Sequence, residues 1–426
     1  MTKAPLDSEK LADWLNWLES LDPSKIELGL DRIRRVYQRL PQLSDSTKVI
    51  TVAGTNGKGS CVTALQAGAL AASKSVVAFS SPHLLRYNER IQLQGCAVAD
   101  ELLVEAFRET ALAQQDTFIT YFEYATLAAL YIAAKNTPDL LVLEVGLGGR
   151  LDSVNLIDAD LVVLTKIGMD HTEWLGKDID SIAYEKCGVI KEGKHLVVAA
   201  RDMPKVVNTS AIEKSVKLFS LGTDFDISLQ AEGGFCLDIG SQSFDIGPLT
   251  LHEWSIAGAC MALKVFWPES IEEIINAMGS LSMLGRYQKK SINGRPVIFD
   301  VAHNAMAIEH LVHRLKTDGM ASVDILFAIM SDKDYESVVE VLSPVARKWY
   351  LLNIDQPRAL SSDILSKALC KSGVEDCYEL NSANSDILDE IFSEENSSIP
   401  LLVTGSFYTV SAVMQLPKIS GQINLN

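Results

Sequence analysis

Apolar runs of strand length alternate with longer helical stretches through the first half of the chain. Leu11, Trp14 and Leu18 recur at helical spacing and predict a first helix. The stretch 25–40 predicts a second helix, or a turn and a helix, ended by Pro41. Strands are predicted at 48–53, 75–81, 139–146 and 160–168, with helices at 61–73 and 122–135. This alternation is typical of a parallel sheet with helices on both faces.

The pattern changes after residue 195. Shorter strand-like pieces with many turn residues, at 195–202, 216–222 and 234–251, predict an antiparallel patch. A helix is predicted at 255–267, and a second series of alternating strands and helices begins near 286. We therefore expect a boundary near 282–290, which divides the chain into residues 1–284 and 285–426.

Composition limits the classes of protein that fit. The 426 residues carry 38 Lys and Arg against 55 Asp and Glu, a formal charge of −17. At about 100–200 residues per domain this length predicts two or three domains. The composition, 47% hydrophobic and 22% charged, is that of a globular protein and argues against disorder. The negative charge argues against nucleic acid as a partner, so any polyanionic ligand must be held by a few placed groups.

The sequence predicts a reduced, cytoplasmic protein. The first residues scatter charges and lack an apolar core, so we expect no signal peptide. No apolar run approaches the roughly 18–20 residues that a membrane span needs. The seven cysteines are irregularly spaced and form no CxxC. This usage favours small apolar fillers over disulfides or a zinc site.

A glycine-rich turn between the first predicted strand and its helix is the main chemical signal. It reads Gly54, Thr55, Asn56, Gly57, Lys58, Gly59 and Ser60. A strand, such a turn and a helix N-terminus direct backbone N–H groups at one anion, and Lys58 reaches outer phosphates. The usual phosphate loop has its hydroxyl directly after the lysine. The extra Gly59 therefore argues against an ordinary GTPase, kinase or motor. The alternative without a binding function is a tight strand-to-helix turn with an exposed lysine.

Glu144 lies near the end of the apolar run 139–146. A carboxylate within a central strand is costly unless it is paired or binds a metal. Ligands of open α/β sheets bind at the carboxyl ends of the strands. Glu144 is therefore expected to hold Mg²⁺ near the glycine loop, and a buried salt bridge with Arg150 is the alternative.

Two further residues follow the run 160–168. His171 is a candidate metal ligand or general acid/base, although a lone histidine is more often structural. Lys186, taken by itself, is a surface charge on a helix.

The second half of the chain carries polar groups after each predicted strand. His303, Ser331 and Ser406 lie in such positions, where they are either ligand contacts or helix caps. Arg286, at the expected domain boundary, is a cation placed to reach a nucleotide.

Taken together, these segments resemble the folylpolyglutamate synthase/dihydrofolate synthase family of the Mur-ligase superfamily of ATP-dependent amide ligases. The matching runs cover nearly the whole chain in order: VAGTNGKGS, SSPHLLRYNERI, YFEYATLAALY, LEVGLGGRLDSVN, DHTEWLG, EKCGVI, LGRYQ, IFDVAHN, SDKD and TGSFYTV. The resemblance implies an α/β fold: a parallel-sheet, P-loop-type ATPase domain with a pterin-site N-terminal segment, then a smaller Rossmann-like glutamate ligase domain.

The resemblance also implies the roles of individual residues. The loop 54–60 would hold the ATP phosphates, with Ser255, Arg286 and Asp300 as further nucleotide contacts. Ser81, Glu144, His171 and a carbamylated Lys186 would bind two Mg²⁺ ions. The implied pterin-binding residues are Glu27, Leu28, Gly29, Leu30, Thr120, Tyr121, Phe122, Glu123, Leu151, Asp152 and Ser153. His303, Ser331 and Ser406 would be on the glutamate side.

One departure from the family pattern is visible. Family members commonly carry Pro-Asn-Ala-Ala where this chain has Trp254, Ser255, Ile256 and Ala257. Ser255 thus takes the place of an asparagine that contacts adenine, and a hydroxyl lacks the paired donor and acceptor of an amide. We expect the adenine contact to be weaker here, or to use a neighbour or water.

The implied reaction adds L-glutamate to 7,8-dihydropteroate, and further glutamates to tetrahydrofolate, through an acyl phosphate. We expect a monomer. The alternatives are a muramyl-type ligase of cell-wall synthesis, a P-loop phosphotransferase or NTPase, and a nucleotide-binding regulator without turnover. The pterin-type segments 27–30 and 120–123 argue against the first, and the Gly57–Ser60 order argues against the second.

Overall fold

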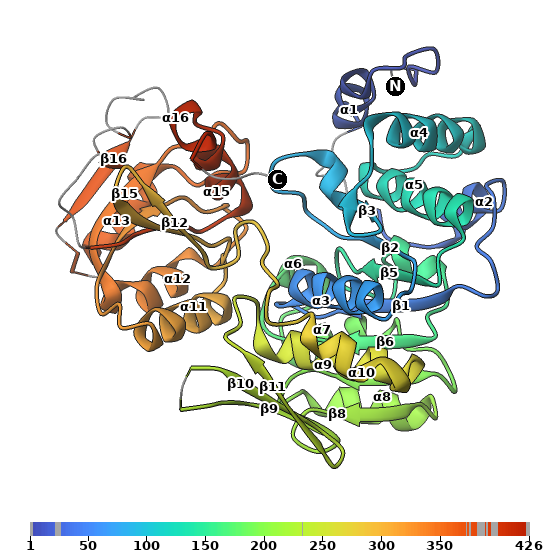
Figure 1. The fold of residues 1–426 in the computed structure, drawn as a ribbon. Helices are drawn as coiled ribbons and strands as arrows, with labels where there is room; N and C mark the ends of the chain where they lie inside the picture. The colour runs from blue at the N-terminus through green and yellow to red at the C-terminus, as the bar shows by residue number, and fades with distance from the viewer. Residues whose placement is uncertain are drawn as a thin grey trace. The chain divides into compact units, whose positions relative to one another are not determined.

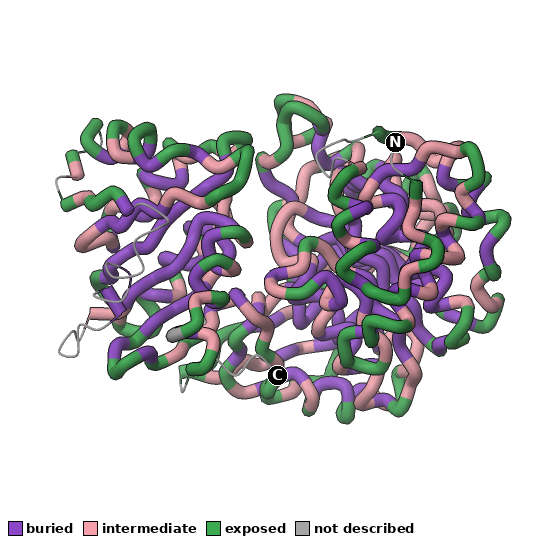
Figure 2. The backbone as a smooth tube through the Cα atoms, turned by 90° about the horizontal axis from the view of Figure 1, so that it is seen from above, coloured by how far each residue is buried: buried purple, intermediate pink, exposed green. Residues whose placement is uncertain are grey.

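The computed structural model describes residues 3–21, 27–231, 233–371, 373–374, 376–380, 388, 391–392 and 399–422. The chain divides into two compact units, Met1–Leu281 and Ser282–Asn426. In each unit the buried backbone runs through the centre and the exposed backbone lies around it (Figure 2). Each unit therefore has a hydrophobic core of its own.

The first unit is built on an eight-stranded sheet with the order β4-β3-β2-β5-β1-β6-β7-β8. Six neighbouring strands, β2, β5, β1, β6, β7 and β8, are parallel to one another. At one edge, β3 pairs antiparallel with β2, and β4 pairs antiparallel with β3. The strands are β1 (Lys48–Ala53), β2 (Val76–Phe79), β3 (Ile91–Leu93), β4 (Cys96–Ala97), β5 (Leu140–Glu144), β6 (Leu161–Leu164), β7 (His195–Val198) and β8 (Lys217–Ser220).

Helices cover both faces of this sheet, because the central strands are apolar on both sides. On one face α3 packs on α9 and α10 (Figure 1). The other face shares one core with helices α1, α4, α5, α7 and α8. The helices are α1 (Leu11–Glu19), α2 (Asp31–Tyr37), α3 (Lys58–Ala71), α4 (Asp100–Gln114), α5 (Tyr121–Asn136), α6 (Thr172–Leu175), α7 (Ile179–Cys187), α8 (Lys205–Glu213), α9 (Glu253–Phe266) and α10 (Ile271–Asn276), with 3₁₀ turns η1 (Tyr87–Arg90), η2 (Ser153–Leu156) and η3 (Pro268–Ser270).

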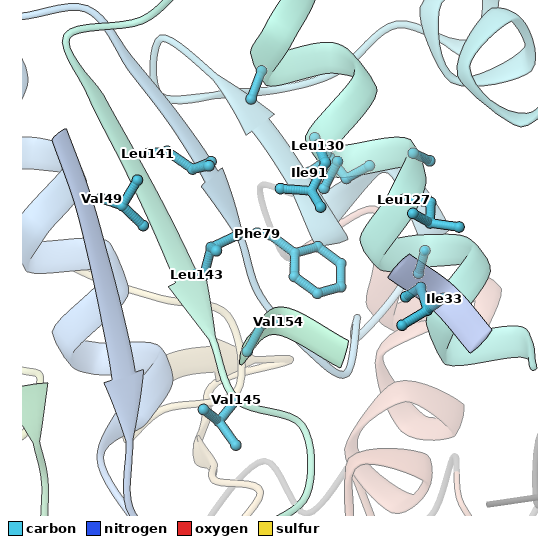
Figure 3. Close-up of a cluster of buried hydrophobic side chains, with 14 of the residues drawn as sticks. Ile33, Val49, Phe79, Ile91, Leu127, Leu130, Leu141, Leu143, Val145 and Val154 are labelled. Atoms are coloured by element: carbon cyan, nitrogen blue, oxygen red, sulfur yellow. The ribbon is translucent and has the colours of Figure 1, made fainter. Parts of the chain in front are cut away.

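Alternate residues of the strands fill that second face. Figure 3 shows Val49, Phe79, Leu141 and Leu143 from three neighbouring strands directed toward helix residues such as Leu127. All of these side chains are buried. Since a side chain two residues further along a strand lies on the same face, the period of two explains this set.

The prediction of an antiparallel patch from residue 195 was wrong for its first two pieces. The strands β7 and β8 pair in parallel with β6 and with each other, and so extend the main sheet. A separate antiparallel sheet of β9 (Phe225–Leu229), β10 (Phe235–Ile239) and β11 (Gln242–Gly247) follows. Short strands with turn residues nearby do not reveal their partners, and here the intervening α8 makes a parallel crossover.

In the described part of the stretch 25–40, the structure agrees with the alternative of a turn followed by a helix. Helix α2 begins at Asp31, and residues 27–30 precede it without helical structure. Residues 25 and 26 of the predicted stretch lie outside the described residues. Gly29 has φ +135, a value that breaks a helix and that glycine adopts most readily.

The second unit is a six-stranded sheet with the order β12-β13-β17-β14-β15-β16, parallel except for β12. The strands are β12 (Gln288–Ile292), β13 (Arg295–Phe299), β14 (Val323–Phe327), β15 (Ala346–Leu352), β16 (Cys377–Leu380) and β17 (Leu401–Thr404). The helices are α11 (Ala305–Thr317), α12 (Tyr335–Leu342), α13 (Ser362–Lys371), α15 (Phe407–Met414) and α16 (Pro417–Ser420), with a 3₁₀ turn η4 (Ser343–Val345).

The two parallel sheets confirm the expected α/β class. In each unit the polar groups singled out above follow the carboxyl ends of the strands, where ligands of open α/β sheets bind. Within the described part of the chain, no helix is long and apolar enough to cross a bilayer.

Candidate active site

The glycine loop joins the end of β1 to the start of α3. Gly54 has φ +151, and a Cβ there would lie 1.9 Å from Thr165 Oγ1. Gly57, the N-cap of α3, has φ +88, and its Cβ would lie 2.4 Å from Ser255 Oγ. Both glycines are thus required by backbone conformation and by close packing.

The segment after β6 braces this loop. The backbone N–H groups of Thr55 and Asn56 donate to Lys166 O at 2.8 and 3.3 Å. The hydroxyl of Thr55 donates to Gly168 O and accepts from Gly168 N, both at 3.0 Å. These hydrogen bonds hold the loop against the segment after β6. The 14-residue helix α3 begins directly after the loop, and its N-cap Gly57 makes no side-chain cap hydrogen bond. A helix N-terminus of this kind is suited to an anion.

Two lysines converge on one carbonyl of the loop. Lys58 Nζ donates to Gly54 O at 3.2 Å, and Lys186 Nζ donates to the same oxygen at 2.9 Å. Lys186 is 5% exposed, so its interpretation as a surface charge was wrong. Helix α7 turns this side chain toward the sheet, while neighbouring Tyr184 is exposed.

Burial changes the acid–base chemistry of Lys186. Desolvation, together with the charge of Lys58, lowers the pKa of this ammonium group to about 7. Asp170 and Asp152 act in the opposite direction. A large fraction of Lys186 is therefore a neutral amine near pH 7, which is the form that reacts with CO₂.

Glu144 is buried at the end of β5, beside the end of β2. Its Oε2 accepts a hydrogen bond from Ser81 N at 3.2 Å. The predicted alternative, an ion pair with Arg150, does not form, because Arg150 binds Glu185 at 2.9 Å. The Ser81 hydroxyl and the Glu144 carboxylate supply the hard oxygen ligands that Mg²⁺ prefers.

Few carboxylates are available as metal ligands at the carboxyl ends of β2 and β5. Among the described residues, no three His, Cys, Asp or Glu side chains gather where they would hold a metal ion. A carbamate on Lys186 is anionic and adds an oxygen donor that the ammonium lacks. The residues present therefore fit a divalent cation best when Lys186 is modified.

His171 lies on the braced segment after β6. It is the N-cap of α6 with φ +52, and its side chain is 40% exposed. Its Nε2 lies 4.0 Å from Asp170 Oδ1, and its backbone N–H donates to the same oxygen at 2.8 Å. Asp170 also acts electrostatically on Lys186. The segment after β6 therefore lies close enough to influence the charge of that lysine.

The segments predicted to bind pterin are joined by one cation that sequence reasoning missed. The guanidinium of Arg32 binds Glu123 Oε1 at 2.7 Å and Glu27 Oε1 at 2.9 Å. Glu123 also closes a capping box with Thr120 at the start of α5. The third segment is tied to α5 by Ser153 Oγ, 2.6 Å from Thr126 Oγ1. Segments 27–30, 120–123 and 151–153 therefore gather around the start of α5.

Asp152 holds the turn after β5. Its carboxylate accepts from the N–H groups of Gly146, Leu147 and Val154 at 2.8–3.0 Å. Burial raises the pKa of Asp152 to about 6, against these hydrogen bonds and the charge of Lys58. Because this turn follows Glu144 directly, Asp152 positions the end of β5.

Asp152→Ala should lower the free energy of unfolding by about 2–4 kcal/mol, because it leaves backbone N–H groups without their acceptor. Urea denaturation measures this. Asp152→Asn, the matched control, keeps one acceptor oxygen and should lose less. A change below about 0.5 kcal/mol for Asp152→Ala would show that the turn does not depend on this carboxylate.

An aromatic cluster lies next to the acceptor segments. A Cβ on Gly146 would meet the Phe122 ring at 2.5 Å, so this glycine lets the ring close over the end of β5. The Tyr87 and Tyr121 rings lie 5.9 Å apart, and the guanidinium of Arg90 lies against both. The run SSPHLLRYNERI was part of the family resemblance, but the sequence assigned no role to either of its arginines, Arg86 and Arg90.

In the second unit, Asp300 and Arg286 lie at the end of β13. Asp300 is partly buried and accepts from Tyr287 N and Ala302 N, both at 2.8 Å. Desolvation raises the pKa of its carboxyl, and Arg286 opposes that shift. The guanidinium of Arg286 lies 4.9 Å from the ring centre of Phe407.

The glutamate-side candidates differ in their contacts. His303 Nδ1 lies 2.8 Å from Val301 O, and its ring packs on Phe407. Ser406 caps α15, since its Oγ accepts from Thr409 N at 2.9 Å. Ser331 is exposed, and its N–H donates to Arg358 O at 2.8 Å. Ser406 is therefore a helix cap, as the alternative predicted. The His303 ring and the Arg286 guanidinium both pack on the Phe407 ring.

Comparison with known families defines the class of protein. Residues 52–244 match the Mur ligase middle domain, and residues 285–407 match the glutamate ligase domain of Mur ligases. The first unit, with its parallel sheet and glycine loop, and the second α/β unit thus correspond to these two domains of a Mur ligase.

Individual relatives narrow this class. The chain is 35% identical to the dihydrofolate synthase/folylpolyglutamate synthase of Escherichia coli over 97% of both chains. It is 30% identical to the enzyme of that name from Bacillus subtilis, over 94% of this chain and 97% of the relative. The chain therefore belongs to the dihydrofolate synthase/folylpolyglutamate synthase family.

Solved structures agree over the same length. The E. coli FolC protein in complex with DHPP and ADP superposes with a TM-score of 0.88 at 33% identity, covering 97% of this chain and 98% of that one. A bifunctional folylpolyglutamate synthase/dihydrofolate synthase with Mn, AMPPNP and L-glutamate bound gives a TM-score of 0.86 at 34% identity, covering 97% and 99%.

Proposed function

We propose that this chain uses ATP to join L-glutamate to 7,8-dihydropteroate, which forms dihydrofolate, and to add further glutamates to tetrahydrofolate. The observation that carries the proposal is the pair of lysines on Gly54 O, at a phosphate loop next to three gathered acceptor segments. The family relationship supports both activities, because relatives at 30–35% identity carry both in their names.

The nucleotide roles follow from the loop. The backbone of residues 54–60 and the N-terminus of α3 bind the phosphates, and Lys58 neutralises charge on the transferred phosphoryl group. Ser255 Oγ lies against Gly57, so this shorter side chain stays beside the loop. Arg286 and Asp300 remain predicted nucleotide contacts on the second unit.

The acceptor is assigned to the segments that Arg32 and Ser153 tie together. Phe122, beside Gly146, offers a ring face to a flat heterocycle. Leu28, Gly29, Leu30, Tyr121 and Leu151 complete the predicted acceptor residues. The ring face and the buried Asp152 carboxylate provide apolar contact and hydrogen bonding, the combination that a pterin needs.

The metal roles fall on Ser81, Glu144, His171 and a carbamylated Lys186, with two Mg²⁺ ions in total. When bound, the metal neutralises negative charge on the phosphates and orients them. A bound Mn ion in the solved relative supports a divalent cation in this family. The chain's charge of −17 increases the need for such placed cations.

The chemistry explains why ATP is needed. A carboxylate does not condense with an amine at neutral pH, since its oxygen is a poor leaving group. The acceptor carboxylate attacks the γ-phosphorus of ATP, which gives an acyl phosphate and ADP. The amine of L-glutamate then attacks the acyl carbon, and phosphate leaves as the amide forms. Lys58 and the loop amides stabilise the phosphoryl group, and His303, Ser331 and Ser406 are the predicted residues for glutamate.

A phosphate-release assay tests the proposal. The protein is given ATP, Mg²⁺ and L-glutamate with dihydropteroate, with tetrahydrofolate, or with a muramyl precursor. Release with either of the first two, together with the glutamylated product by mass spectrometry, is the expected result. Release with the muramyl precursor alone indicates a cell-wall ligase, and release without any acceptor indicates a plain NTPase.

A further inference from the structure

A buried cation lies beside the acceptor segments. Arg90 ends η1 and is 8% exposed. Its Nε donates to His83 Nδ1 at 2.8 Å, so that ring nitrogen is an unprotonated acceptor. Its guanidinium carbon lies 5.2 Å from the ring centre of Tyr87 and 5.5 Å from that of Tyr121.

Among the described residues, Arg90 has no anionic partner. Its contacts are the imidazole and two phenol rings, all without negative charge. The nearby carboxylate of Glu89 is directed away, since it accepts from the N–H groups of Leu84, Leu85 and Arg86. A buried charge is normally paired. The two terminal nitrogens of the Arg90 guanidinium are therefore suited to bind the carboxylate of a ligand.

A ligand carboxylate bound to Arg90 would lie close to the segments predicted to bind the acceptor molecule. Tyr121 belongs to the acceptor segment 120–123 and packs on the guanidinium. The carbonyl of Arg90 accepts from Ser80 N at 2.9 Å, next to Ser81, which donates to Glu144. Within the described chain, none of the Arg90 side-chain contacts is with the phosphate loop, where the reacting carboxylate must go.

The two acceptors differ by one carboxylate. Dihydropteroate has a single carboxylate, and it reacts. Tetrahydrofolate ends in glutamate, so one carboxylate reacts and the other is left over. We propose that Arg90 binds this unreacted carboxylate of the folyl acceptor and is thereby a specificity residue for glutamate addition to folates. The proposal rests on the function proposed above and adds to it a reason why one site accepts both molecules.

Arg90→Met tests this assignment. With tetrahydrofolate, kcat/KM should fall about 10- to 100-fold, mainly through KM, since a charge-assisted hydrogen bond is lost. With dihydropteroate, kcat/KM should stay within about 3-fold of wild type, which also reports an intact fold. Arg86→Met is the matched control: Arg86 lies on the same segment but pairs with Asp100 at the surface, and both acceptors should be unaffected.

An acceptor without the extra carboxylate gives an independent test. Tetrahydropteroyl-γ-aminobutyrate keeps the reacting carboxylate and lacks the other. Wild type and Arg90→Met should use it with kcat/KM values within about 3-fold. Equal losses with dihydropteroate and tetrahydrofolate, or an unchanged kcat/KM for tetrahydrofolate, would overturn the proposal. If wild type used neither acceptor, the proposed function itself would be wrong.

Discussion

Lys58→Ala should reduce glutamate ligation about 1000-fold or more and leave the fold intact. The lysine is the cation that the loop presents at the N-terminus of α3, and it is held there by the carbonyls of Gly54 and Thr55 at 3.2 Å. Charge on the transferred phosphoryl group is greatest in the transition state, so losing this cation lowers kcat more than ATP binding. Product formation under single-turnover conditions measures the chemical step directly.

The controls separate catalysis from folding. Lys74→Ala, beyond the other end of α3, removes a lysine that lies over the Trp267 ring and should keep wild-type turnover. Glu144→Ala should lose ligation as Lys58→Ala does, because it removes the carboxylate beside Ser81. Near-normal turnover of Lys58→Ala would contradict the role given to the loop.

Lys186→Ala should lower ligation about 100- to 1000-fold, since it removes the lysine on which we propose a metal-binding carbamate, an anion worth several kcal/mol. The proposed carbamate would form when the neutral amine attacks CO₂ and releases its proton. The amine form of Lys186 increases as the pH rises through its pKa of about 7. Enzyme stripped of CO₂ should therefore regain activity more fully with bicarbonate at pH 8 than at pH 6. The charged groups that act on this amine are Lys58, Asp170 and Asp152.

Short carboxylic acids should partly restore Lys186→Ala, because they supply the missing carboxylate. Lys186→Arg is the matched control, since its guanidinium keeps a positive charge but forms no carbamate, and acids should not restore it. Mass spectrometry of the wild-type protein should detect the CO₂ adduct on the peptide that contains Lys186. An unmodified lysine in fully active enzyme would contradict this prediction.

The sequence determined the fold class and the loop. Alternating strands and helices predicted the parallel sheets, and local spacing alone identified residues 54–60, since a strand, a turn and a helix are neighbours in the chain. The family resemblance, carried by ordered runs over the whole chain, was confirmed. These signals are local or periodic, so one sequence holds them completely.

The tertiary structure decided what depends on distant segments. The sequence did not reveal that Lys186 is buried on Gly54, that Arg32 joins Glu27 to Glu123, or that β7 and β8 extend the main sheet. Ser406 proved to be a helix cap. Likewise, Arg90 is one more cation in the sequence, and only the folded chain shows that none of the described residues is its counter-ion. Charge and pKa depend on desolvation and on neighbours across the fold, and neither is written in the spacing of residues.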